Sequence, residues 1–256
     1  MLWDNFIWFG IVAVFLSAAG AVSALCGRNR AAVSLTSVST AALAGFIVLL
    51  WMGLDRPPLK TMGETRLWYS FFALVSGLFT YLRWRYRWIL SFSTVLATVF
   101  IVINILKPEI HDQSLMPALQ SPWFIPHVTV YMFSYSLLGC AFLLAVAGLF
   151  RKGGDILTAA DTLVYIGTAF LTFGMLSGSI WAKEAWGHYW SWDPKETWAL
   201  VTWLSYLLYI HMRRMGRGTA KGLCLLLVFS FICLQMCWWG VNYLPSAQDS
   251  IHVYNR

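Results

Sequence analysis

The chain has 256 residues, of which 59% are hydrophobic and 11% charged, and its mean hydropathy is +0.65. This composition excludes a water-soluble domain of that length and indicates an integral membrane protein. The net charge of +7 does not indicate nucleic-acid binding, because the arginines gather in short turns where a basic face cannot spread.

Eight apolar runs are long enough, or nearly so, to cross a hydrocarbon core of about 30 Å. They cover residues 6–25, 31–52, 67–82, 88–106, 127–150, 162–181, 197–212 and 222–244. The third and seventh runs are the shortest. We therefore predict an all-α, polytopic membrane bundle of about eight transmembrane helices, built as a single integral membrane domain over residues 1–256.

The distribution of lysine and arginine predicts the orientation of this bundle. The connections after the first, third, fifth and seventh runs carry eleven of the eighteen cations and only two acids, Asp155 and Asp161. Cationic loops are retained on the cytoplasmic side of a membrane. We therefore expect both termini and the other connections to be extracytoplasmic. The outer segments are then a proline-rich loop at 107–126, a tryptophan-rich loop at 181–198 and a C-terminal tail at 245–256.

The tryptophan-rich loop is the most informative segment, since it holds five tryptophans and a tyrosine between two apolar runs. Indole faces are large, rigid and polarisable, so a cluster of them can hold a flat ring system. Tryptophan is common at membrane interfaces. However, the crowding of Trp186, Tyr189, Trp190 and Trp192 within seven residues favours a ligand platform, and haem is the predicted ligand.

The end of this loop also has a plain structural interpretation. Asp193 is predicted to cap the next helix, with Pro194 at its first position and Glu196 closing a capping box. On this reading the two acids serve the helix and not a ligand.

Histidine is the residue type that would bind the iron of a haem as a neutral ligand. His127 and His252, both expected on the outer side, are candidate axial ligands, because low-spin haem takes two ligands in trans. His111 and His188 are interpreted as ordinary interfacial residues. His211 would lie roughly 21 Å further inward along the seventh run. An ionisable group at such a depth is a functional candidate, although the arginines that follow it also fit a side chain that reaches the inner headgroups.

Several segments resemble one known family. Trp186-Gly-His-Tyr-Trp-Ser-Trp-Asp-Pro-Lys-Glu-Thr-Trp198 resembles the tryptophan-rich WWD signature of the haem-handling cytochrome c assembly superfamily, in the form typical of its CcsA (ResC) type. Residues 115–135 resemble the approach to the family's first external histidine, matched by His127. Residues 240–254 resemble the region of the second, matched by His252, where the usual His-Ser-Tyr-Gly is His-Val-Tyr-Asn. His211 matches a histidine that the family keeps within the membrane.

The resemblance implies a role in system II cytochrome c maturation. Such a protein of the bacterial inner (plasma) membrane or the thylakoid receives haem b, held non-covalently, from the cytoplasmic side. It presents the haem to an apocytochrome c carrying Cys-x-x-Cys-His for thioether formation, as a subunit of a holocytochrome c synthase (haem lyase) complex. The residues implied as haem contacts are Trp181, Trp186, Tyr189, Trp190, Trp192 and Asp193, and the implied iron ligands are His127, His252 and His211.

A CcsB (ResB)-like membrane subunit is the implied partner. If His211 ligates iron, a second deep imidazole is needed, and no other histidine lies inside an apolar run. A partner chain would have to supply it.

Two alternative functions stay open at this point. A transporter or quinone-reactive subunit would need charged or polar groups at mid-membrane, whereas the acids of this chain are expected in the loops. A haem exporter or chaperone of the CcmC type would have six helices and a different sequence after Trp-Asp.

Overall fold

The computed structural model describes residues 3–112, 121–150 and 155–245, and the described residues form helices joined by turns, with no strand among them. The chain divides into two compact units, residues 1–120 and residues 121–256. We call them the first unit and the second unit, and each is described by itself.

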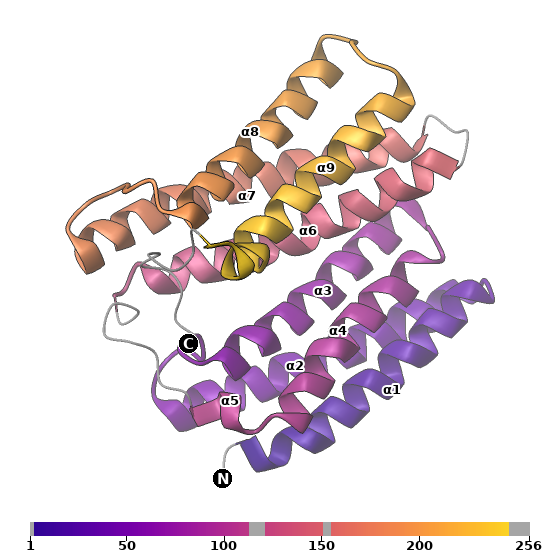
Figure 1. The fold of residues 1–256 in the computed structure, drawn as a ribbon. Coiled ribbons are helices and arrows are strands. Elements are labelled where there is room, and N and C mark those ends of the chain that lie inside the picture. Colours follow the sequence, from indigo (N-terminus) through magenta and orange to yellow (C-terminus); the bar gives the residue numbers. More distant parts are fainter. Residues whose placement is uncertain (1–2, 113–120, 151–154, 246–256) are drawn as a thin grey trace. The chain divides into compact units, whose positions relative to one another are not determined.

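The first unit is an up-and-down bundle of four antiparallel helices (Figure 1). A short 3-10 helix, η1 (Trp3–Asn5), precedes the first long helix and a short helix, α5 (Glu109–Asp112), follows the last. The four long helices are α1 (Phe6–Leu25), α2 (Asn29–Leu54), α3 (Met62–Trp84) and α4 (Ile89–Leu106). Local signals set their ends. Gly27 takes a positive φ of 77° in the turn after α1, and Thr61 with Glu64 forms a capping box at the start of α3.

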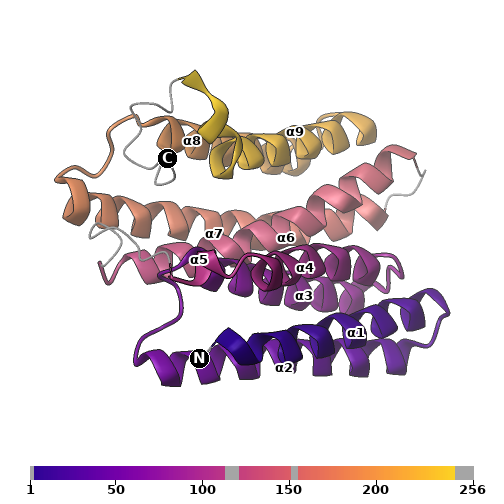
Figure 2. The ribbon, with the colours of Figure 1, turned by 60° about the horizontal axis from the view of Figure 1, so that its bottom comes forward.

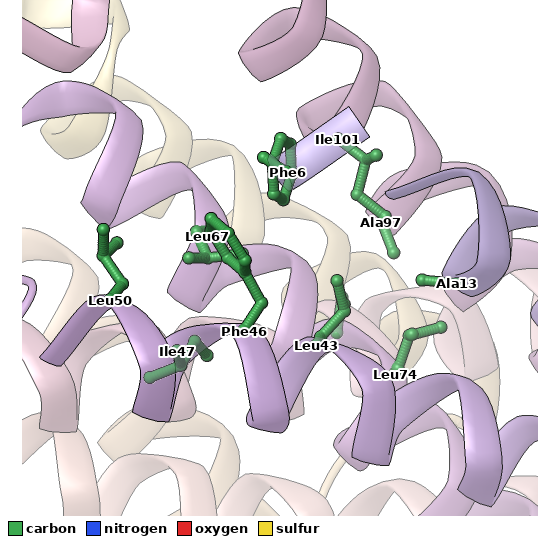
Figure 3. Packing of buried hydrophobic residues seen from close by; sticks show 11 residues of the cluster. Phe6, Ala13, Leu43, Phe46, Ile47, Leu50, Leu67, Leu74, Ala97 and Ile101 are labelled. Carbon is green, nitrogen blue, oxygen red and sulfur yellow. The ribbon is translucent and has the colours of Figure 1, made fainter. Parts of the chain in front are cut away.

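The core of the first unit lies between these four helices. Phe6 from α1, Phe46 from α2, Leu67 from α3 and Ile101 from α4 are all buried, and they point into one cluster (Figure 3). Helix backbones also approach closely, since Ser39 of α2 donates a hydrogen bond of 2.7 Å to the carbonyl of Ala13 in α1. Burial of apolar side chains together with small polar ones that bond to backbone is typical of helix packing in membranes.

The second unit contains four antiparallel helices and a short 3-10 helix after them (Figure 2). They are α6 (Phe124–Phe150), α7 (Asp155–Trp186), α8 (Pro194–Arg214), α9 (Ala220–Trp238) and η3 (Gly240–Tyr243). The most extensive helix pair is α6 against α7, α8 packs on α7 and α9, and α9 also packs on α6. The long α7 therefore runs beside both α6 and α8.

The predicted helical membrane bundle is confirmed. In the part of the chain that the structure describes, eight helices have 18 residues or more, and six of them are apolar enough to cross a membrane. The other two are α3 and α8, the runs that looked shortest. Their lengths of 23 and 21 residues suffice for a crossing, and charged residues near their ends account for their lower hydropathy.

Most of the predicted boundaries differ by one to seven residues from the helix ends in the structure, and two of these differences affect the segments around the site. The run expected at 162–181 belongs to a helix of 32 residues that continues to Trp186, because Ala182, Lys183 and Ala185 are strong helix formers and Gly187, at φ 87°, ends it. The last helix, expected to reach residue 244, ends at Trp238. Gly240 lies so close to Met236 that a Cβ would come within 2.5 Å of its sulfur, and the chain tightens there into η3.

The expectation that the acids lie outside the helices was also wrong, since Glu64 lies in α3, Glu184 in α7 and Glu196 in α8. The most deeply placed exception along α7 is Asp161. This residue lies in the second turn of α7, where Arg213 of α8 pairs with its carboxylate and the hydroxyl of Tyr209 donates a hydrogen bond of 2.7 Å to it. A helix can carry this carboxylate because the charge is neutralised by a neighbour. The group pairs near the end of two helices and does not form a mid-membrane relay.

Candidate functional site

The α6–α7 pair holds His127 in an aromatic stack at one end of the second unit. His127, Tyr131 and Tyr135 are four residues apart on α6 and therefore share a face. The ring centroids of His127 and Tyr131 are 4.5 Å apart, and those of Tyr131 and Tyr135 are 5.5 Å apart with the rings nearly parallel, at 24°. The Tyr135 ring meets Trp238 of α9 edge-on at 6.3 Å. A continuous row of rings thus runs from His127 along α6 to α9.

Glycines on α7 make room for this row. A Cβ on Gly178 would lie 2.5 Å from Nδ1 of His127, and a Cβ on Gly174 would collide with the ring of Tyr131. Nδ1 of His127 lies 2.8 Å from the carbonyl oxygen of Gly174. Because a carbonyl oxygen only accepts hydrogen bonds, Nδ1 carries the proton and the lone pair of the neutral ring is on Nε2.

Trp181 forms the next wall of the site. Its side chain is only 4% exposed, and its ring lies 5.4 Å from that of His127, tilted by 31°. The ring of Phe124, at the start of α6, lies 5.3 Å from that of Trp181, and the ring of Trp186 meets Trp181 edge-on at 4.8 Å. Trp181 and Trp186 are residues of α7, so they lie on the helix and not in the loop where the sequence placed them. Three predicted site residues, His127, Trp181 and Trp186, are therefore brought together.

The loop proper, residues 187–193, carries the exposed aromatic side chains. Tyr189 is 58% exposed and Trp192 is 67% exposed, while Trp190 is half-buried and meets Trp192 edge-on with centroids 5.9 Å apart. Trp192 has a φ of 61°, in the left-handed region that disfavours a bulky side chain. A large apolar side chain is thus held in strained backbone and faces outward, which is a feature of binding sites more than of folding cores.

Polar contacts hold both ends of this loop. Glu196 accepts hydrogen bonds from the backbone N–H groups of Ser191, at 2.7 Å, and Asp193, at 3.2 Å. The buried carboxylate of Asp193 accepts from the N–H of Lys195 at 2.9 Å. The predicted capping box of α8 is confirmed. At the other end, Nζ of Lys183 donates to the carbonyl of Gly187 at 2.7 Å and lies 5.5 Å from the centre of the Tyr189 ring.

The remaining histidines lie elsewhere. His211 lies in the last turn of α8, at the end of the second unit opposite His127, and it is exposed. His188 is exposed in the loop. His111 belongs to the first unit, where its ring stacks on Trp3 at 3.9 Å and 8°. His252, the second predicted outer ligand, and most of the tail at 245–256 lie outside the described residues, as do residues 113–120 of the proline-rich loop.

Sequence reasoning missed four residues of this site, Tyr131, Tyr135, Gly174 and Gly178. A signal was present in the sequence, because small residues four positions apart in a membrane helix mark a close contact with another helix. His127, Tyr131 and Tyr135 have the same spacing on the partner helix. Which glycine faces which ring depends on the register of α6 against α7, and the sequence of either helix alone does not give it.

Comparison with known proteins identifies the same family over most of the chain. The family described as Cytochrome C assembly protein matches residues 59–247, which include α3 to α9 and both sides of the site above. The match begins well before residue 115, the first residue of the segments that resemble this family, and it ends before His252.

Similar proteins agree with this match. A cytochrome c biogenesis protein CcsA from Cuscuta exaltata is 32% identical over 240 residues, 78% of each chain. A CcsA protein from Chlamydomonas reinhardtii is 36% identical over 175 residues, 63% of this chain and 50% of the other. Among solved structures, a cytochrome c haem lyase CcmF has the same fold, with a TM-score of 0.70 at 17% identity, over 91% of this chain and 46% of the longer CcmF chain.

Proposed function

Because the chain belongs to the cytochrome c assembly protein family, we propose that it binds haem at the His127 end of the second unit and presents it to apocytochrome c. The chain is an integral membrane protein that acts in cytochrome c maturation. We further propose which ligand the chain binds, where it binds it, and on which side of the membrane that site lies. The His127 end faces the extracytoplasmic side of a bacterial inner (plasma) or thylakoid membrane, as the cationic loops at the opposite helix ends indicate.

The single observation that carries this proposal is the state of His127. Nδ1 lies 2.8 Å from the carbonyl oxygen of Gly174 and therefore carries a proton, so the neutral form of this ring has its lone pair on Nε2. A neutral imidazole whose other nitrogen is bonded to a backbone carbonyl is the usual form of a metal-bound histidine. The chemistry of this donor therefore fits haem iron, and the rings of Tyr131 and Trp181 restrict how the imidazole can rotate.

The aromatic loop fits a flat ligand. Trp181 and Trp186 form a wall beside His127, while Tyr189, Trp190 and Trp192 offer ring surface at the outside. Asp193 acts on haem indirectly, since its contacts cap α8 and fix the loop. The exposed indole of Trp192 in strained backbone costs folding free energy, and binding a porphyrin would account for that cost. We propose His252 as the second axial ligand and His211 as the ligand of an inner haem site.

Haem b is the substrate in this scheme, and bond making belongs to haem and apocytochrome c. Each cysteine S–H of the Cys-x-x-Cys-His segment adds across one vinyl C=C, so that a C–S bond and a C–H bond form without net oxidation. The side chains of this protein would hold the ring, saturate the iron and leave the vinyl edge accessible. In this role the chain is a subunit of a holocytochrome c synthase (haem lyase) complex.

An absorption spectrum of the purified chain tests the proposal. The variant Trp192→Gly tests whether the exposed indole takes part in haem binding. The wild-type chain should show a Soret band. Glycine at residue 192 relieves the left-handed backbone, so the free energy of unfolding should change by no more than about 1 kcal/mol, while the Soret band per protein falls. A transporter or scaffold without haem chemistry predicts no Soret band in either protein, and that result would exclude the proposed function.

A partner membrane subunit of the CcsB (ResB) type is proposed to complete the inner site. His211 is exposed on the same face of α8 as Leu204 and Leu208, which are about half exposed, so a second protein can approach it. We expect the chain purified alone to hold inner haem, if any, through a single histidine, and co-purification with the partner to give a bis-histidine spectrum. A full bis-histidine spectrum of the chain alone that is lost in His211→Ala would contradict this partnership.

A further inference from the structure

The contact between α6 and α7 places a different kind of α6 side chain against each of three α7 glycines. Near its middle, Leu138 of α6 packs against Gly167 of α7, where a Cβ would lie 2.7 Å from the leucine side chain, and Ser134 donates a hydrogen bond of 2.7 Å to the Gly167 carbonyl. Further along, Gly174 receives the ring of Tyr131 and Gly178 receives the ring of His127. All three glycines allow close helix packing, and only the last two are next to the proposed ligand.

Two separate features of α7 act on His127. The carbonyl of Gly174 accepts the hydrogen bond from Nδ1, and the missing side chain of Gly178 provides the space in which the imidazole lies. The Gly174 carbonyl selects the Nδ1–H tautomer of His127, and the absence of a side chain at Gly178 permits the rotamer of its ring. An alanine at 178 would place a methyl group 2.5 Å from Nδ1 and 2.6 Å from Cε1, so the ring would have to turn away from the Gly174 carbonyl.

The helix backbone of α7 normally uses the Gly174 carbonyl for its own hydrogen bonds. This carbonyl also accepts one from the hydroxyl of Ser177, at 3.1 Å, besides the one from His127. The bond from Ser177 stays within α7 and is common in helices, whereas the bond from His127 comes from another helix and needs close approach to the α7 backbone. The glycines at 174 and 178 leave it uncovered.

We propose that Gly174 and Gly178 are positioning residues that hold His127 as the Nδ1–H tautomer and so present Nε2 to haem iron. This inference rests on the proposed function and deepens it. The α7 helix would thus set the tautomer and the orientation of the His127 ring that binds iron, although α7 is not proposed to contribute a metal ligand of its own. Groups that orient a metal ligand in this way typically contribute about ten- to a hundredfold to metal affinity.

A merely structural role for these glycines predicts something different. If they serve helix packing alone, alanine at 167 and alanine at 178 should have similar consequences, because both introduce a methyl group into the same helix pair at a similarly short distance. Gly167→Ala is therefore the matched control for Gly178→Ala.

The experiment has two readouts on the full chain, one of which needs no haem. Chain labelled with 15N-histidine is examined by NMR without haem, and the His127 signals are assigned by their loss in His127→Ala. The same proteins are then titrated with haem, and the affinity and spectrum are recorded. We expect a protonated Nδ1 in the wild type and in Gly167→Ala. In Gly178→Ala we expect loss of that tautomer, an affinity lower by about ten- to a hundredfold, and an altered axial-ligand spectrum.

The inference and the proposed function can fail separately. A wild-type His127 protonated at Nε2, or a Gly178→Ala variant that matches Gly167→Ala in both readouts, would overturn the positioning role. If Gly178→Ala does not fold, the protonated nitrogen of His127 in the wild-type chain still tests the positioning role, because protonation at Nε2 would overturn it. A wild-type chain that has the expected tautomer and yet takes up no haem would instead refute the proposed function.

Discussion

Replacing His127 with alanine should reduce the yield of holocytochrome c by about tenfold or more, since even groups that only support a metal ligand contribute that much. The imidazole contacts the rings of Tyr131 and Trp181, and its Nδ1 bonds to the Gly174 carbonyl, whereas His188, the other described histidine of this end, is exposed in the loop. The measurement is the amount of haem covalently attached to a reporter apocytochrome c. The reporter is produced with this chain and the proposed CcsB (ResB)-like subunit in cells that lack their own maturation system.

The matched control is His188→Ala. His188 is also a histidine of the outer end, but it is exposed in the loop and no ring stacks on it among the described contacts. Its replacement should leave the yield within about twofold of wild type, the size of context effects to be expected from a surface change. Equal losses in the two variants would mean that histidines at this end of the second unit are needed for a reason other than ligation at residue 127.

Replacing Arg213 with alanine should destabilise the second unit by about 3 kcal/mol, because it leaves a carboxylate in the helix pair without its countercharge. The side chains of Asp161 and Arg213 are 14% and 27% exposed, and Nε of Arg213 lies 2.8 Å from Asp161 Oδ1. Tyr209 alone would then remain to bond the carboxylate. Thermal unfolding in detergent, followed by circular dichroism, measures the loss.

Two further variants separate this charge effect from packing. Asp161→Asn combined with Arg213→Ala removes both charges and should recover a large part of the stability. Arg214→Ala, in the same turn of α8, removes a cation that stacks on Tyr165 and should cost less than about 1 kcal/mol. If the double variant is less stable than Arg213→Ala alone, the uncompensated carboxylate is not the cause of the loss.

Local signals in the sequence were enough for much of the fold. The run at 6–25 became α1 with the same bounds, and Asp193, Pro194 and Glu196 begin α8 as their capping pattern predicts. The bounds of α1 and the start of α8 could be predicted because both are set by residues that are close together in the sequence. The extension of α7 to Trp186 and the helical position of Asp161 were missed, because a hydropathy limit ends a helix at its first charges, whereas the backbone continues where propensity and ion pairing allow.

The candidate site was predictable in kind and only partly in arrangement. Aromatic density and residue type selected His127, Trp181 and Trp186, which the structure brings together. The glycines that receive His127 and Tyr131 were not recognised, because their role depends on how two helices are aligned. His127 and His211 lie at opposite ends of the second unit. This separation agrees with the two haem positions that we propose.

The most direct test asks which nitrogen is bound to iron. His127→Gly is loaded with haem in the presence of imidazole labelled with 15N, and pulsed electron paramagnetic resonance measures the coupling of nitrogen to the ferric iron. The space left beside Gly178 and Trp181 should accept the added imidazole, so haem binding should return and a 15N coupling should appear. Haem that binds equally well without imidazole, or that shows only 14N couplings when labelled imidazole is present, would contradict ligation of haem at residue 127.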